Sequence, residues 1–151
     1  MELKRDAYCG LYCGACPVFL ANEQGKVEEL AQNWEKKPEE LVCFGCKSEQ
    51  VTPWCTTCAI KLCAQNKRYE FCFECDELPC DKMTTFIEDE RYPYHLGVMK
   101  NLDFILQKGV ETWLQAQDAR WRCPECRTKF AWQDETCKNC GSSVSNYKAD
   151  L

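Results

Sequence analysis

The sequence predicts a small metal-stabilised α+β fold, made of a cysteine-rich module, a helical segment and a C-terminal ribbon. Fifteen of the 151 residues are cysteine, and all of them belong to six short clusters. Residues 81–120 contain no cysteine but have apolar residues at helical spacing. Residues 121–151 carry one two-cysteine motif twice, which is typical of two knuckles joined by a hairpin. We therefore expect three segments, 1–80, 81–120 and 121–151.

The cysteine clusters have the spacing of metal ligands. They are Cys9-x3-Cys13-x2-Cys16, Cys43-x2-Cys46, Cys55-x2-Cys58-x4-Cys63, Cys72-x2-Cys75-x4-Cys80, Cys123-x2-Cys126 and Cys137-x2-Cys140. Two thiolates separated by two residues can bind one tetrahedral ion, because the turn between them points both sulfurs inward. The start of the chain lacks the apolar stretch of a secretory signal, which favours a reducing cytoplasm and free thiols over disulfides. We expect all fifteen cysteines to be ligands of three or four zinc ions.

Eleven of these ligands lie in the first module, residues 1–80. Local pairing would close one site with Cys43, Cys46, Cys55 and Cys58, and a second with Cys63, Cys72, Cys75 and Cys80. Cross-paired sites would use the same residues. Cys9, Cys13 and Cys16 then lack a fourth ligand. His95, the only histidine, would bring the total to twelve ligands, although a lone histidine is more often a surface or packing residue.

The N-terminal triplet has alternative interpretations. The spacing C-x3-C-x2-C also holds iron–sulfur clusters with one open iron, but the enzymes that use it need a large α/β barrel, for which this chain is too short. A closed zinc site or a structural iron–sulfur cluster is the better hypothesis. A redox role for Cys55-Thr56-Thr57-Cys58 lacks the strand-then-helix setting that activates such thiols, so a structural ligand is favoured there.

Apolar spacing predicts the helices. Val27, Leu30, Ala31 and Trp34 form one stripe, which predicts a helix over about residues 22–37 that Pro38 ends. Two or three helices are expected over 81–120, with stripes at Met83/Phe86/Ile87, Val98/Met99/Leu102/Ile105/Leu106 and Val110/Trp113/Leu114. Gly109 is expected in the left-handed conformation at the end of the second helix.

The C-terminal segment is predicted to be a zinc ribbon. Cys123-Pro124-Glu125-Cys126 and Cys137-Lys138-Asn139-Cys140 flank ten residues that contain Phe130-Ala131-Trp132. Gly141 permits a positive φ after the last ligand. Zinc would supply most of the folding free energy, because about thirty residues bury too little surface to fold alone. Trp132 is a candidate for stacking on a base, although such a residue more often packs the hairpin.

Composition disfavours several classes of partner. The formal net charge is −5, and every four-thiolate zinc site would add two further negative charges, which opposes attraction to nucleic acid or anionic membrane. No apolar run is long enough to span a membrane. No nucleophile–base pair or phosphate-binding glycine loop is present, so we lean against an enzyme. The first hypothesis is a multi-zinc module that binds a protein partner or itself. The alternatives are a metalloenzyme or iron–sulfur redox protein using Cys9/Cys13/Cys16, and nucleic-acid binding through the ribbon.

The motif Cys9-Gly10-Leu11-Tyr12-Cys13-Gly14-Ala15-Cys16-Pro17 resembles the opening of the bacterial and archaeal family called domain of unknown function 3795. Two later segments, Cys55-x2-Cys58-Ala59-Ile60-Lys61-x-Cys63-Ala64 and Phe71-Cys72-x2-Cys75-x3-Pro79-Cys80, are similar to its later motifs, so the resemblance covers about residues 8–84. Family ribbons often have glycines after the second cysteine, where this chain has Arg127-Thr128-Lys129. The resemblance implies a cytoplasmic, zinc-binding protein and carries no activity.

Overall fold

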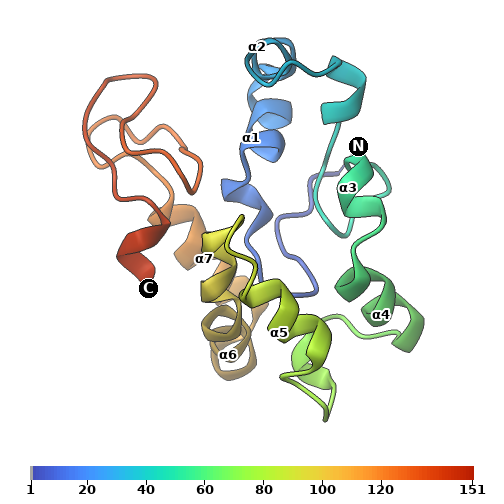
Figure 1. Cartoon of the computed structure of the whole chain (residues 1–151). Coiled ribbons are helices and arrows are strands. Elements are labelled where there is room, and N and C mark those ends of the chain that lie inside the picture. The colour runs from blue at the N-terminus through green and yellow to red at the C-terminus, as the bar shows by residue number, and fades with distance from the viewer. Residues whose placement is uncertain (1) are drawn as a thin grey trace.

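A computed structural model describes residues 2–151 as an assembly of short helices (Figure 1). The α-helices are α1 (Pro17–Gln24), α2 (Val27–Asn33), α3 (Pro53–Thr56), α4 (Ala59–Lys67), α5 (Asp81–Ile87), α6 (Val98–Lys108) and α7 (Val110–Arg120). Single 3-10 turns are η1 (Cys13–Ala15), η2 (Pro38–Leu41), η3 (Cys72–Glu74), η4 (Pro93–Gly97) and η5 (Tyr147–Asp150). The small, helical and cysteine-rich part of the predicted fold class is therefore confirmed.

The β part of the prediction is not confirmed. Within residues 2–151 there are only isolated bridges, which pair Asp6 with Tyr12, Arg122 with Lys129, and Thr136 with Ser143. The last two each close a single turn around a Cys-x2-Cys motif. A turn of this size uses its backbone hydrogen bonds locally, so no ladder extends from one motif to the other.

The prediction of a single helix over residues 22–37 is wrong, because the chain turns at Gly25. Gly25 has a φ of 69° and a ψ of 33°, and its N–H donates to the Ala21 carbonyl, so it ends α1 in the left-handed conformation. The chain then starts α2 at Val27. Glycine adopts this conformation without steric cost, which is why the two short helices replace a single long one. Ala31 of α2 is buried against Val18 and Leu41, close to Cys43.

The helical segment is confirmed as three helices, α5, α6 and α7, with η4 between α5 and α6. α6 and α7 pack together (Figure 1). Gly109 joins them with a φ of 90° and a ψ of 156°, so it has the expected positive φ but an extended ψ, outside the left-handed helical region. Its N–H donates to the Ile105 carbonyl over 2.8 Å, which satisfies one terminal group of α6.

One apolar core joins all three predicted segments. It contains Ala7, Tyr12 and Ile60 from the first, Met83, Leu102 and Trp113 from the second, and Trp121, Phe130 and Val144 from the third. Trp113 of α7 is fully buried, and the Tyr12 ring meets it edge-on with centroids 5.8 Å apart. Whether the three segments fold as separate units stays a prediction.

The loop that carries the first cysteines lies directly on α6. A Cβ at Gly10 would lie 2.7 Å from the Val98 carbonyl oxygen and 2.9 Å from Leu102 Cγ, and φ there is +93°. The Asn101 side chain donates to the Gly10 carbonyl over 2.9 Å. Only glycine fits this contact, so the Cys9–Cys13 loop is fixed against the helical segment.

The C-terminal segment docks beside α1, where Figure 1 shows its loops. The Trp132 N–H donates to the Ala15 carbonyl over 3.0 Å, and the Tyr147 N–H donates to the Trp132 carbonyl over 2.8 Å. The Trp132 ring is buried and stacks on Tyr94 with centroids 4.1 Å apart. These contacts place the C-terminal Cys-x2-Cys motifs against the N-terminal cysteine-rich segment.

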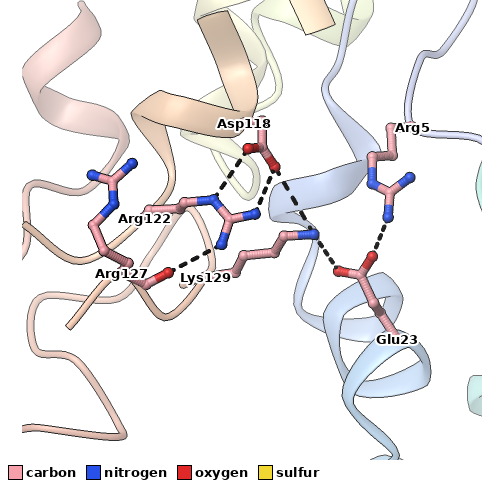
Figure 2. A network of polar contacts seen from close by, with 6 residues as sticks. All are labelled: Arg5, Glu23, Asp118, Arg122, Arg127 and Lys129. Carbon is pink, nitrogen blue, oxygen red and sulfur yellow. Dashed lines mark hydrogen bonds and ion pairs between the residues drawn. The ribbon is translucent and has the colours of Figure 1, made fainter. Parts of the chain in front are cut away.

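Ion pairs reinforce this docking (Figure 2). Glu23 of α1 accepts from Arg5 and from Lys129, whose ammonium lies 2.9 Å from the carboxylate. Lys129 also lies 3.9 Å from Asp118 of α7, which pairs with Arg122. One network of alternating charges therefore joins α1, α7 and the C-terminal segment.

Across the described part of the chain, no helix has the length and apolar character needed to cross a membrane.

Candidate metal centre

The four C-terminal cysteines converge on one point. The sulfurs of Cys123, Cys126, Cys137 and Cys140 all lie within 4.8 Å of one another. Two sulfur pairs, Cys123/Cys140 and Cys126/Cys137, are 3.6 Å apart. A tetrahedral zinc ion with Zn–S bonds of about 2.3 Å needs sulfurs about 3.8 Å apart. This group can therefore hold a metal ion with little movement, and its donor set of four thiols suits zinc or iron.

The two knuckles have the same local structure. The N–H of the first cysteine donates to the carbonyl five residues on, Cys123 to Thr128 over 2.9 Å and Cys137 to Ser142 over 2.8 Å. The residue after the second cysteine has a positive φ in both, 66° at Arg127 and 78° at Gly141. Arg127 thus adopts the turn in which ribbons of the similar family often have glycine, and the backbone is the same in both knuckles.

Hydroxyl groups support the second sulfur of each knuckle. Thr128 Oγ1 lies 3.3 Å from Cys126 Sγ, and Ser142 Oγ lies 3.3 Å from Cys140 Sγ. Hydrogen bonding with Thr128 and then Asn139 lowers the pKa of Cys126 to about 5, and hydrogen bonding with Ser142 lowers the pKa of Cys140. Both shifts favour the thiolate, the form that binds metal. The repeated pattern Cys-x-Thr/Ser is visible in the sequence, but our sequence analysis missed its role.

All fifteen cysteines are free thiols in this structure. The eleven outside the C-terminal segment are less tightly gathered. Among residues 2–151, no other three metal-ligating side chains have all their ligand atoms within 4.8 Å of one another. Their assignment as metal ligands stays a prediction, but the structure does show which of them are neighbours.

Seven of the eleven lie near one another and are called the seven-thiol group here, although Cys72, one of the other four, is also near Cys9 and Cys58. Its members are Cys9, Cys13, Cys16, Cys43, Cys46, Cys55 and Cys58. Burial raises the pKa of Cys9 well above its ordinary value, and the nearby Cys46 and Cys58 raise it further. Burial likewise raises the pKa of Cys16 to about 12, with Cys43 and Cys55 beside it. The triplet at the start of the chain therefore lies against the four cysteines of residues 43–58.

Backbone groups already point at several of these sulfurs. The Cys46 N–H donates to Cys13 Sγ over 3.5 Å, and the Gly45 N–H donates to Cys43 Sγ over 3.5 Å. The hydrogen bond from the Leu11 backbone opposes the raised pKa of Cys9. Backbone hydrogen bonds from Phe19 and Val18, at the start of α1, do the same for Cys16. Such N–H donors stabilise thiolates, which favours metal binding at this group.

The remaining four cysteines surround a small cavity. Cys63, Cys72, Cys75 and Cys80 line one cavity of about 50 Å³, together with Lys67. Burial raises the pKa of Cys72 to about 12, with further contributions from Cys80, Cys63 and Cys75. The Lys67 ammonium lies 3.8 Å from Cys75 Sγ. These are the four residues that local pairing assigned to one zinc site.

The contacts of His95 do not support the role of metal ligand that was considered for it. Its Nδ1 lies 3.0 Å from the Phe86 carbonyl oxygen, and its ring stacks on Phe86 with centroids 3.6 Å apart. The Tyr94 ring meets it edge-on at 4.9 Å. Burial lowers the pKa of His95. These contacts are those of a packing residue, so the triplet gains its extra neighbours from other cysteines instead.

Two further sequence interpretations can be compared with the structure. Cys58 stands at the start of α4, but the element before it is the short helix α3, so the strand-then-helix setting of an activated redox motif is absent here, as expected. The pKa of Cys55 is raised, chiefly by burial, which is the opposite of an activated redox thiol. Trp132 is buried against Tyr94, so its ring does not offer a free face for a base.

The fold and the site define a small helical, cysteine-rich protein with a four-thiol group that can hold a metal ion. The chain belongs to the family described as protein of unknown function (DUF3795), whose model matches residues 5–85. That range includes the seven-thiol group and the cavity-lining cysteines, and it excludes the ribbon motifs. No curated protein and no solved structure matches the chain.

Proposed function

We propose that this protein is a multi-zinc structural and interaction module, in which thiolate-bound ions hold together the surface that a protein partner or a second copy of the chain binds. The observation that carries the proposal is the convergence of Cys123, Cys126, Cys137 and Cys140 within 4.8 Å. The seven-thiol group and the cavity lined by Cys63, Cys72, Cys75 and Cys80 support further ions. The expected total is three or four zinc ions per chain, in a cytoplasmic protein.

Exposed apolar side chains support a protein partner. Trp54 of α3 is 48% exposed, and Leu62 of α4 is 51% exposed. Both lie beside the metal-binding cysteines in sequence, so metal binding would order the segment that presents them. Large apolar side chains are unfavourable in water, and tryptophan is enriched where proteins bind one another.

An iron–sulfur protein is the second candidate. Its supporting observation is the set of backbone N–H groups directed at Cys9, Cys13 and Cys16, because hydrogen bonds to sulfur are a principal means of tuning iron–sulfur clusters. Nucleic-acid binding through the ribbon has less support, since Trp132 is buried and the net charge is −5. If it occurred, affinity would fall steeply with salt concentration.

Metal analysis of anaerobically purified protein separates the candidates. The zinc module predicts a colourless protein with three or four zinc ions per chain, which a chelator removes. The iron–sulfur candidate predicts a brown protein with iron and acid-labile sulfide. A Cys126→Ser variant should lose one ion in either case, because it removes one ligand of the C-terminal group. Fewer than two metal ions per chain in the unmodified protein would refute the multi-metal proposal.

A further inference from the structure

Two arginines at the end of α7 contact the C-terminal segment in different places. Arg120, the last residue of α7, pairs with Asp150 over 2.9 Å and donates to the Asn146 carbonyl over 2.8 Å. Arg122, just beyond the helix, donates through Nη1 to the Arg127 carbonyl over 3.1 Å. Arg120 therefore holds the end of the chain, whereas Arg122 holds the first of the two knuckles.

Asp118 fixes the direction of the Arg122 guanidinium. Nε lies 3.1 Å from Oδ2 of that carboxylate, and Nη2 lies 3.2 Å from Oδ1. Figure 2 shows the guanidinium between the Asp118 carboxylate and the Arg127 carbonyl. Such two-point pairing restricts the planar group to one orientation, which a lysine ammonium would not. The contact with Arg127 is therefore set by α7.

The Arg127 carbonyl belongs to the turn that brings two ligands together. Arg127 follows Cys126, has a φ of 66°, and its N–H donates to the Cys123 carbonyl over 2.9 Å. The left-handed conformation is unfavourable for a residue with a Cβ, so surrounding contacts have to hold it. The hydrogen bond from Arg122 is such a contact. It reaches the residue directly after Cys126, so its loss would change where the Cys126 sulfur lies.

The same knuckle is held on its other side by Lys129. The Lys129 ammonium lies 2.9 Å from Glu23 of α1 and 3.9 Å from Asp118. The backbones of Arg122 and Lys129 pair in an antiparallel bridge, so both residues leave the knuckle together. Two carboxylates, from α7 and α1, thus hold the two ends of the first knuckle (Figure 2).

The second knuckle has no comparable attachment. Among residues 2–151, no ion pair joins residues 137–142 to a helix, and Lys138 pairs only with Asp134 of the same segment, over 4.0 Å. Its first cysteine, Cys137, is buried in the core, but the backbone hydrogen bonds that shape the knuckle lie within it. An ion bound by both knuckles would therefore connect the second one to the ion pairs of the first.

We propose that Arg122, oriented by Asp118, is a positioning residue of the C-terminal metal centre, and that metal binding there and docking of the first knuckle on α1 and α7 stabilise each other. The inference rests on the proposed function, since it requires an ion at the four C-terminal cysteines. Coupling of this kind is reciprocal. The factor by which the Arg122 contacts strengthen metal binding equals the factor by which the ion strengthens those contacts.

The test compares Arg122→Met, Asp118→Asn and Arg120→Met in the full-length protein. Methionine keeps an unbranched apolar side chain without the guanidinium, and asparagine keeps the shape of Asp118 without its charge. Arg120→Met is the matched control, because it removes similar contacts at the same helix end that hold residues 146–150 instead of the knuckle. Zinc release to an excess of chromogenic chelator is followed under reducing, anaerobic conditions. The C-terminal ion is the class that is absent from Cys126→Ser.

We expect Arg122→Met to release the C-terminal ion about tenfold faster, the usual size for loss of an outer contact of a metal ligand. Asp118→Asn should change the same class in the same direction, because Arg122 then loses the partner that orients it. Arg120→Met should release this ion at the unmodified rate, and the other classes of ion should be unaffected in all three variants.

Urea unfolding supplies a second readout that a purely structural contact would not change. Asp118→Asn should lower the unfolding midpoint less in the Cys126→Ser background than in the unmodified one, because without the C-terminal ion only the contact itself is lost. Ions at the other cysteines stay bound in both backgrounds, so the comparison isolates the C-terminal centre.

Two results would overturn the inference. One is release of the C-terminal ion from Arg122→Met at the unmodified rate. The other is an equal loss of midpoint from Asp118→Asn in both backgrounds, which an ion pair that only supports the fold would produce. If Cys126→Ser holds as many ions as the unmodified protein, the C-terminal site itself is refuted, and the proposed function fails together with this inference.

Discussion

Arg127 and Gly141 occupy the same position in the two knuckles, one residue after the second cysteine. The φ angles of 66° and 78° are nearly equal, yet only glycine adopts them without steric strain. The Arg127 carbonyl accepts from Arg122 over 3.1 Å, whereas its own side chain points away from the ion-pair network in Figure 2. The strain is therefore not offset by contacts of that side chain in the network.

Arg127→Gly should stabilise the metal-loaded protein by up to about 1 kcal/mol, because it relieves a left-handed residue while leaving the carbonyl contact in place. Gly141→Ala should cost about the same amount, since a Cβ there meets open space and only the backbone is strained. Urea unfolding at neutral pH measures both. A destabilised Arg127→Gly would show that the arginine side chain contributes more than its conformation costs.

Gly45 is a second position where geometry requires glycine. It lies between Cys43 and Cys46 with a φ of +112°, and a Cβ there would overlap the backbone carbonyl of Lys4. The Lys4 N–H donates to the Phe44 carbonyl over 2.8 Å, so the two segments are held together. A backbone obstacle of this kind cannot rotate away as a side chain can.

Gly45→Ala should therefore destabilise the protein by about 3 kcal/mol or more and reduce its zinc content, since it displaces the loop that carries two of the predicted ligands. Gly97→Ala is the matched control. Its Cβ would meet nothing within 4 Å, and its effect should be about 0.5 kcal/mol or less. Equal unfolding midpoints for the two variants in urea would contradict the assigned contact.

At the scale of elements, α1 connects the N-terminal cysteine-rich segment to the C-terminal segment. Burial would raise the pKa of the Glu23 carboxyl, but hydrogen bonds from Lys129 and Arg5 outweigh it and hold the pKa below its ordinary value of 4.5. A lowered folded-state pKa means that ionised Glu23 stabilises the native state above pH 4.5. This contribution is lost as the pH falls through the folded-state value.

Glu23→Gln should cost about 1–2 kcal/mol at pH 7, because two cations lose their partner while solvent screens part of the loss. The difference from the unmodified protein should begin to shrink as the pH falls below 4.5 and should vanish once Glu23 of the folded protein is also protonated, at a lower pH. Glu29→Gln, an exposed residue on α2, should change little at any pH. Chemical unfolding as a function of pH tests this. A deficit that stays constant through acid pH would contradict the role of the charge.

Sequence patterns correctly predicted those helices that are determined by neighbouring residues in the chain. The stripes that contain Phe86, Leu102 and Trp113 gave three helices, because 3.6-residue spacing and the glycine at 109 act locally. The single helix over 22–37 was wrong, since the apolar stripe continued past Gly25 and only its backbone conformation shows the turn. The α+β class stays unconfirmed, because Cys-x2-Cys knuckles satisfy their backbone groups within one turn.

In the candidate site, too, local spacing predicted one part, and contacts between distant segments determine the rest. The C-terminal group follows from spacing alone, because its two knuckles face each other directly. The seven-thiol group could not be predicted from spacing, since it depends on long-range contacts, such as that of Gly45 with the Lys4 backbone and that of the Cys46 N–H with Cys13 Sγ.

At the scale of the whole molecule, one apolar core runs through all three segments, but it is built from short helices and joined to cysteine loops. Cys9, Cys123 and Cys137 are themselves buried members of that core. A bound ion would therefore fix residues on which Trp113, Trp121 and Phe130 pack. Loss of metal should weaken the core as well as the loops, since the same side chains belong to both.

Thermal melting before and after complete removal of metal by a chelator, under reducing and anaerobic conditions, tests this account most directly. We predict that the stripped protein loses its cooperative transition and that added zinc restores it. An unchanged melting curve after removal, with metal analysis showing an empty protein, would contradict the claim that thiolate-bound ions hold this fold together.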